Sequence, residues 1–339
     1  MRILVFGQTG QLGSALARHP NVFAVGRTVA DLRFPQSCAE IITALQPTAV
    51  INAAAFTAVD AAEDTSDLAR VVNAEAPRAM AEACAGQSIP FLQLSTDYVF
   101  DGTGDRPWRP DDSVAPINHY GVTKAAGEAA VREVGGCAVI LRTSWVFASG
   151  AQNFMTNVLR QAATQSRLSV VDDQVGGPTP AESLAEACLT IVARLIDAPE
   201  LAGTYHYSGG PDVSRSDWAR EILRVAGASA QIQGVRTDAV ASRAHRPLNS
   251  RLDCTRTEQV FSLQRPDWRA TLAEDVAGLA RQVDGKGGTK DGTEGGTEGG
   301  VEGGIQGEMP SELQQAARNN AHGADTVAVT GVGSRERSR

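Results

Sequence analysis

Residues 3–13 read Ile3-Leu-Val-Phe-Gly7-Gln-Thr-Gly10-Gln-Leu-Gly13, an apolar run that passes directly into a glycine-rich turn and a helical pattern. Gly7 permits a tight turn, Gly10 lets a pyrophosphate approach the backbone, and Gly13 lets the helix pack closely on a sheet. The N–H groups at the start of such a helix attract anions. This context predicts a dinucleotide-binding fold, although the spacing is GxxGxxG rather than GxGxxG.

Apolar runs and helical patterns alternate through the first half of the chain. The runs do not alternate apolar with polar residues, which is typical of parallel strands buried on both faces. We therefore predict an α/β fold with a Rossmann-type, doubly wound parallel sheet. The expected strands are Ile3–Phe6, Val22–Val25, Ala49–Ile51, Phe91–Leu94 and Ala138–Leu141.

The pattern loosens after about residue 150. Helices are expected at Phe154–Gln165, Ala181–Ile196 and Asp217–Val225, with short strands near Leu168–Val171 and Thr204–Tyr207. We predict that residues 1–150 form most of the nucleotide-binding domain. Residues 151–284 should form a smaller C-terminal α/β substrate lobe, with strands or helices free to return to the first sheet.

The composition changes abruptly at Gly285. Eleven of the 24 residues from 285 to 308 are glycine, and such a stretch has little apolar surface to bury. Residues 285–339 are therefore predicted to be a low-complexity, mostly disordered tail.

The charge balance excludes several classes of partner. With a formal charge of −8, the sequence shows no basic stripe for nucleic acid or an anionic membrane surface. No signal peptide or membrane span precedes Gly7, so we expect a cytoplasmic protein. The five cysteines are widely spaced without His neighbours at metal-ligand spacing, so reduced thiols and no cysteine metal site are expected.

Tyr120-Gly-Val-Thr-Lys124 begins a helical pattern that continues to Val134. The i,i+4 spacing places the phenol and the ammonium on one helix face. A free phenol has a pKa of about 10, and a nearby cation would lower it toward the range useful for proton transfer. The sequence has only three lysines, at 124, 286 and 290, against 28 arginines. Lysine at 124 therefore indicates a chemical requirement for an ammonium group.

Polar and small residues follow two other expected strands, at the edge where open α/β sheets bind ligands. Thr96 follows the strand Phe91–Leu94 and could hydrogen-bond a reacting carbonyl oxygen, and Ser95 competes for that role. Ala53-Ala-Ala55 ends the strand at Ala49–Ile51, where bulky side chains would block the cofactor. These positions predict one site at the carboxyl edge of the sheet.

Taken together, the sequence resembles the dTDP-4-dehydrorhamnose reductases over residues 1–283. The resemblance is carried by Gly7–Gly13, Asn52–Asp60, Ser95–Gly104, Tyr120–Lys124, Arg142–Val146 and Arg246–Leu252. It implies reduction of dTDP-4-dehydro-L-rhamnose to dTDP-L-rhamnose, the last step in synthesis of the activated sugar. It also implies a catalytic set of Tyr120, Lys124 and Thr96, with Tyr120 protonating the nascent alkoxide.

The resemblance implies further site residues. For the substrate these are Thr96, Asp97 and Trp145 at the sugar, with Asn153, Arg246 and Asn249, or Arg251 instead, at the diphosphate. For the cofactor they are Gly7, Gly10, Gln11, Leu12, Gly13, Arg27, Asp31, Leu32, Ala53, Ala54, Ala55, Thr57, Tyr120 and Lys124.

Two positions depart from the family's pattern. The acidic residue expected after the second strand is Gly26, followed by Arg27, so NADPH is favoured over NADH, while Asp31 keeps NADH open. The family's Mg²⁺ site between the subunits of a homodimer retains only Glu182, because Ala15 stands at the other position. One carboxylate makes a weak Mg²⁺ site, so no metal ligand is assigned.

Two alternatives remain open at this point. A nucleotide-sugar dehydratase or epimerase would hold NAD⁺ permanently, but a dehydratase needs a second carboxylate where this sequence has Tyr98. The regulatory subunit of methionine adenosyltransferase also resembles these reductases and acts as a binding partner rather than a reductase. The Tyr and Lys motif alone does not separate that class from an enzyme.

Overall fold

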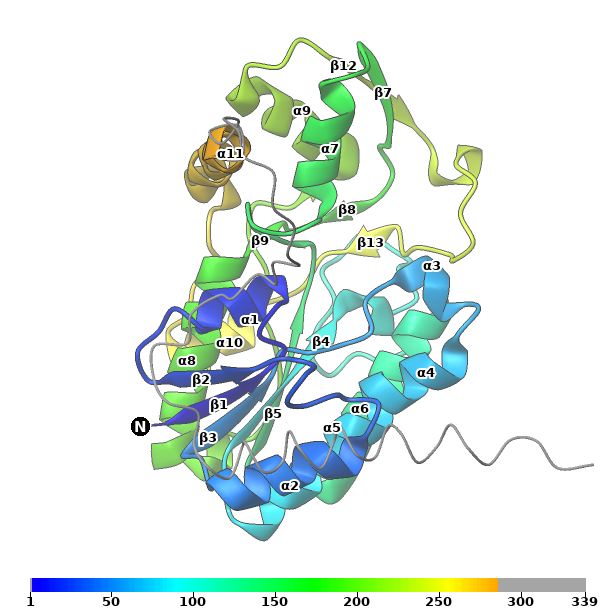
Figure 1. The fold of residues 1–339 in the computed structure, drawn as a ribbon. Helices are drawn as coiled ribbons and strands as arrows, with labels where there is room; N and C mark the ends of the chain where they lie inside the picture. Colours follow the sequence, from blue (N-terminus) through cyan, green and yellow to red (C-terminus); the bar gives the residue numbers. More distant parts are fainter. Residues whose placement is uncertain (1, 286–339) are drawn as a thin grey trace, which may run out of the picture.

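The computed structural model describes residues 2–285 and is built around a six-stranded parallel sheet (Figure 1). The strand order is β10-β5-β4-β3-β1-β2, which confirms the α/β, Rossmann-type prediction. All five pairs of neighbouring strands are parallel. The strands are β1 (Ile3–Phe6), β2 (Val22–Val25), β3 (Ala49–Asn52), β4 (Phe91–Thr96), β5 (Ala138–Thr143) and β10 (Gly203–His206).

Both faces of this sheet are buried, which explains its unbroken apolar runs. In β1, Ile3 and Val5 pack against one group of helices, while Leu4 and Phe6 pack against the other. The first group is α1 (Gln11–Leu16), α8 (Ala181–Asp197) and α10 (Thr255–Phe261). The second group is α2 (Pro35–Leu45), α5 (Ala76–Gly86) and α6 (His119–Val134), below and to the right of the sheet in Figure 1.

The chain returns to this sheet after residue 150. Helix α8 packs on α1, and β10 pairs in parallel with β5, with Tyr205 opposite Leu141. The core of the first lobe therefore includes apolar side chains such as Leu184 and Ile191 from the second half of the sequence.

A smaller lobe lies beyond the sheet, with α7, α9 and β7 at the top of Figure 1. Its core surrounds Trp218, which is 1% exposed. Its elements are α7 (Phe154–Ala162), β7 (Arg167–Val171), β8 (Val175–Gly176), β11 (Val213–Ser214), α9 (Arg215–Ala226), β12 (Gln231–Val235), β13 (Asn249–Ser250) and α11 (Trp268–Gly285).

The described residues also form several shorter elements. They are α3 (Val59–Ala62), α4 (Ser66–Arg70), the π-helix Val71–Glu75, β6 (Val146–Phe147), β9 (Thr179–Pro180) and the 3₁₀ helices Asp97–Val99, Pro199–Leu201 and Thr237–Ala239. No helix within residues 2–285 is long and apolar enough to cross a membrane. Apart from Gly285, which ends α11, the tail predicted at 285–339 lies outside the described residues.

Candidate active site

The glycine loop after β1 has two glycines that the fold itself requires. Gly7 has φ +101°, and a Cβ on it would lie 2.8 Å from the Ala54 nitrogen. A Cβ on Gly13 would overlap the Gly7 carbonyl oxygen. Gly10 is different, because a Cβ on it would lie no closer than 3.4 Å to its nearest neighbour, the Gly7 carbonyl oxygen. Open space at Gly10 fits the close approach of a ligand to the backbone.

A cavity of about 600 Å³ opens beside this loop. Of the residues predicted to bind the cofactor, only Gly13 is absent from its wall, because Gly13 packs against the loop. The predicted residues that line the cavity are Gly7, Gly10, Gln11, Leu12, Arg27, Asp31, Leu32, Ala53, Ala54, Ala55, Thr57, Tyr120 and Lys124. A glycine loop, a helix start and a wall of small side chains fit a dinucleotide.

Two arginines line the cavity just beyond the end of β2. Arg27 is exposed, and Arg33 donates from Nε to Asp31 Oδ2 at 2.8 Å. Burial raises the pKa of Asp31, but the hydrogen bonds and charge of Arg33, aided by the charge of Arg27, outweigh it and lower the pKa overall. Asp31 is therefore a carboxylate neutralised by a neighbour. Sequence reasoning missed Arg33, whose pairing with Asp31 depends on the turn that joins them.

Helix α6 carries the Tyr–Lys pair and begins at a well-defined cap. The Asn118 side chain accepts a hydrogen bond from the Gly121 nitrogen at 2.8 Å. Tyr120 and Lys124 both line the cavity, as their spacing predicts. The Lys124 ammonium is 4% exposed and donates to the Leu94 carbonyl oxygen at 2.6 Å. Burial lowers the pKa of Lys124 to about 8, although the charge of Glu128 opposes this shift.

The pKa of the Tyr120 phenol is raised, whereas the sequence-based expectation is that a nearby cation lowers it. Burial raises its pKa, a hydrogen bond with Thr96 partly opposes the rise, and the charge of Asp97 adds to it. Lys124, whose ammonium bonds to Leu94, does not lower the pKa as expected. The phenol therefore keeps its proton at neutral pH, which is the form that a proton donor needs.

Their hydrogen bonds decide whether Ser95 or Thr96 is available to the reacting carbonyl oxygen. The Ser95 hydroxyl donates to Glu128 Oε1 at 2.5 Å, away from Tyr120. The Thr96 hydroxyl bonds to Asp97 Oδ1 at 3.1 Å and also reaches Tyr120. Burial raises the pKa of Asp97 to about 6, although hydrogen bonds from Ser250 and Thr96 oppose the rise. Thr96 is thus the residue that reaches the phenol, although neither Thr96 nor Asp97 is among the residues that line the two cavities.

Glu128 is a second residue that sequence reasoning missed, and it is acidic. It is 1% exposed and binds the buried Arg142 guanidinium through both oxygens, at 2.8 and 2.7 Å. Arg132 also donates to it, at 2.5 Å. A signal was present in the sequence, because Tyr120, Lys124 and Glu128 lie four residues apart and share one helix face.

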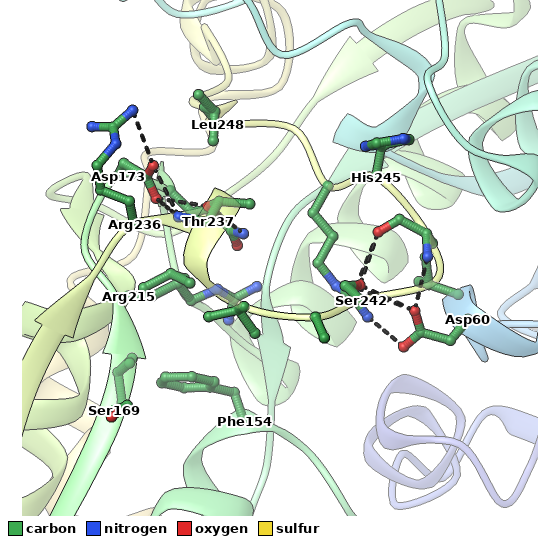
Figure 2. Close-up of a pocket in the computed structure, with 18 of the residues that line it drawn as sticks. Asp60, Phe154, Ser169, Asp173, Arg215, Arg236, Thr237, Ser242, His245 and Leu248 are labelled. Atoms are coloured by element: carbon green, nitrogen blue, oxygen red, sulfur yellow. Dashed lines mark hydrogen bonds and ion pairs between the residues drawn. The ribbon is translucent and has the colours of Figure 1, made fainter.

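A larger cavity of about 1570 Å³ lies against both lobes (Figure 2). It meets the smaller cavity at Thr57, which lines both. Tyr98 lines the larger cavity, and its ring centroid is 5.6 Å from that of Tyr120 in an edge-on contact. Tyr120 therefore stands where the two cavities adjoin.

Of the residues predicted for the diphosphate, Asn153 and Arg246 line the larger cavity and Asn249 does not. The Asn249 amide is buried and donates to the Thr103 and Arg106 carbonyl oxygens at 3.3 and 2.8 Å. The donors of Asn249 are therefore occupied by the backbone of a neighbouring loop and are not directed at the cavity, contrary to the sequence-based expectation.

The other two candidates already have partners. The Asn153 amide donates to Gln11 Oε1 at 2.9 Å while its oxygen caps α7. Arg246 pairs with Asp60 of α3 at 2.6 Å, across the two lobes.

Trp145 is 9% exposed and has an unusual backbone conformation. Its φ is +49°, in the left-handed region that non-glycine residues rarely adopt. A Cβ on Gly176 would lie 2.9 Å from the Trp145 ring, so the indole packs against a position where only glycine fits without displacement. Trp145 is not among the residues that line either cavity, but its ring contacts Arg215, which lines the larger one. A strained, closely packed tryptophan at such a place is typical of a functional position.

The described residues include no group of three or more His, Cys, Asp or Glu side chains placed to hold a metal ion. Glu182, the retained position of the family's Mg²⁺ site, pairs with Arg18. Ala15 is buried in the core of the first lobe.

The comparisons with known proteins agree with this geometry. The model of the family described as RmlD substrate binding domain matches residues 1–281. The dTDP-4-dehydrorhamnose reductase of Salmonella typhimurium is 39% identical over 284 residues, which cover 79% of this chain and 94% of the relative.

Two solved structures of dTDP-4-dehydrorhamnose reductases share the fold. The structure from Clostridium acetobutylicum has a TM-score of 0.77 and 32% identity, and the match covers 83% of this chain and all of that one. The structure from Bacillus anthracis, in complex with NADP, has a TM-score of 0.75 and 31% identity, covering 81% and 98%. The chain therefore belongs to the dTDP-4-dehydrorhamnose reductase family.

Proposed function

We propose that this chain is an NAD(P)H-dependent oxidoreductase that reduces the C4 ketone of dTDP-4-dehydro-L-rhamnose, forming dTDP-L-rhamnose. The observation that carries the proposal is the position of Tyr120, which lines the smaller cavity together with the glycine loop and contacts Tyr98 of the larger one. Curated relatives of that activity match nearly their whole length, which supports the choice of substrate.

The residues of the smaller cavity hold the cofactor. The chemistry that NAD(P)H supplies when bound is transfer of a hydride to the ketone carbon. The loop at Gly7–Gly10 and the start of α1 hold the pyrophosphate, and Ala53–Ala55 leave room for the nucleotide. Lys124 holds the ribose hydroxyls and places its ammonium beside the reacting centre.

The proton comes from the chain itself. Thr96 donates a hydrogen bond to the ketone oxygen, and Tyr120 passes its phenolic proton to that oxygen as the negative charge develops. Because burial keeps the phenol protonated, the donor is ready at neutral pH. Lys124 then stabilises the phenolate that remains until it regains a proton. The family resemblance assigns Asp97 and Trp145 to the sugar.

The reductase activity is tested by adding the purified chain to the keto sugar generated in situ from dTDP-glucose by the upstream enzymes. Oxidation of NADPH and accumulation of dTDP-L-rhamnose are expected. A chain that purifies with tightly held NAD⁺ and consumes no added NADPH would instead be an epimerase or dehydratase. A chain inactive with either cofactor that co-purifies with a synthetase would be a regulatory subunit.

Cofactor choice should favour NADPH, and Arg27→Ala should raise KM for NADPH at least tenfold more than KM for NADH. The 2′-phosphate is the group that separates the two cofactors, and the exposed Arg27 guanidinium is free to contact it. Arg33 already forms a hydrogen-bonded ion pair with Asp31, so its guanidinium is less available to the 2′-phosphate.

Steady-state kinetics with both cofactors checks the prediction. The matched control is Arg78→Ala, a partly exposed arginine on α5 that does not line the cavity. Equal changes in KM for the two cofactors would place Arg27 away from the 2′-phosphate.

A further inference from the structure

Arg215 is the first residue of α9 and lies on the same cavity wall as Phe154 (Figure 2). Its guanidinium lies over aromatic rings. The guanidinium carbon lies 3.6 Å from the centre of the Trp145 ring and 4.9 Å from that of Phe154. The start of α9 is fixed as well, because the Ser214 hydroxyl caps the helix by accepting a hydrogen bond from the Asp217 nitrogen. Aromatic rings and a helix start thus hold the side chain at one place on the cavity wall.

Within the described residues the Arg215 guanidinium forms no ion pair, unlike the neighbouring arginines of the cavity. Within residues 2–285, three other arginines line the larger cavity, and each lies within 4.0 Å of a carboxylate. These pairs are Arg236 with Asp173, Arg243 with Asp64 and Arg246 with Asp60. Across the same described part of the chain, the Arg215 guanidinium makes no ion pair or hydrogen bond with another side chain. Its contacts there are the three aromatic rings of Trp145, Phe154 and Trp218.

The stacking leaves the hydrogen-bonding edge of the group available. A guanidinium donates its five N–H bonds in its own plane, whereas the rings of Trp145 and Phe154 attract its face. Burial lowers the pKa of Arg215 to about 10, so the group remains charged at neutral pH. Asp97 acts on this charge without forming an ion pair with it, so the partly desolvated N–H groups still need acceptors that a ligand can supply. The site therefore suits an anion with several acceptor oxygens.

On the basis of the proposed function, we infer that Arg215 binds the diphosphate of the nucleotide sugar. The diphosphate is the charged part of that substrate, since the base and the keto sugar are neutral. Phosphate oxygens also match the planar fork of an arginine. Arg246 is less suited, because a diphosphate would first have to displace Asp60.

The position of Arg215 is consistent with catalysis at Tyr120. Its charge acts on both Asp97 and Tyr98, and Tyr98 contacts Tyr120. A diphosphate at Arg215 therefore leaves the attached sugar close to Trp145 and Thr96. In this role Arg215 is a positioning residue, which anchors the charged end of the substrate while other groups act on the ketone.

The test uses isothermal titration calorimetry with dTDP and with thymidine, a probe without phosphate. Arg215→Met keeps a side chain that can pack on the rings and removes the charge. It should weaken dTDP binding on the order of 30-fold or more, and thymidine binding less than about twofold. Arg220→Met is the matched control, because Arg220 lies on the same helix, outside the cavity, and pairs with Asp217. It should bind both probes like the wild type.

Arg215→Lys keeps the charge without the fork and should be intermediate for dTDP. The melting temperature of each free variant shows that it is folded, and an unchanged Kd for NADPH shows that the cofactor cavity is intact. Equal weakening of dTDP and thymidine, unchanged dTDP binding, or a wild-type chain that binds no dTDP would overturn the inference. Arg215-dependent dTDP binding by a wild-type chain without reductase activity would overturn the proposed function and leave this inference standing.

Discussion

Replacing Lys124 by arginine is expected to lower kcat by about 10²- to 10⁴-fold, the range that general acid catalysis contributes. The ammonium occupies a buried site and donates to the Leu94 carbonyl oxygen at 2.6 Å. A guanidinium keeps the charge, but its planar head is too wide for that site and displaces the donors from the ribose and from Tyr120. Overpacking should cost some stability, whereas the circular dichroism at 25 °C should match the wild type.

Tyr120→Phe should lower kcat at least as much, because it removes the proton that is transferred. The double variant should lose less than the product of the two single losses, since a lysine that acts through a phenol has little left to do without it. A Lys124→Arg enzyme with half the wild-type kcat, or fully multiplicative losses, would refute the coupled mechanism.

The pH profile gives an independent readout. The pKa of Lys124 is lowered to about 8, so the charged form prevails below that pH and is lost as pH rises through it. The rate of the wild type should therefore fall on the alkaline side near pH 8. Because the charge of Glu128 opposes the lowering, Glu128→Gln should move this limb to lower pH. An unchanged limb would show that Lys124 does not govern it.

The second large effect concerns stability: Glu128→Ala should lower the free energy of unfolding by about 3–5 kcal/mol. Both Glu128 oxygens bind Arg142, and the two side chains are 1% and 2% exposed. Removing the carboxylate leaves a buried guanidinium with no counter-charge, which is more costly than the loss of the pair itself. A fall in Tm on the order of 10 °C is expected, measured by differential scanning calorimetry.

Two comparisons make this prediction specific to the buried pair. Arg132→Ala removes a half-exposed partner of the same carboxylate and should cost less than about 1 kcal/mol. Replacing Glu128 and Arg142 together by methionine should recover much of the loss, because no charge remains buried. If Glu128→Ala and Arg132→Ala had equal effects, the buried pair would not be the source of the stability.

Much of the nucleotide-binding half of the site could be predicted from the sequence because its signals are local. The turn at Gly7–Gly13 and the strand runs depend on backbone conformation and side-chain period within a few residues. The spacing of Tyr120 and Lys124 determines a shared helix face wherever the helix lies. The structure has the turn and the strands where these signals predict them, and Tyr120 and Lys124 both line the smaller cavity.

The tertiary structure decided which polar groups are free. Asn249 and Arg246 match a family motif, but a loop backbone and Asp60 already occupy their hydrogen bonds. The phenol of Tyr120 has a raised pKa because its desolvation depends on everything packed around it. Arg215 has no signal in the sequence, since its rings come from residues 145, 154 and 218. Desolvation and ion pairing sum contributions from distant segments, and these contributions exist only once the chain has folded.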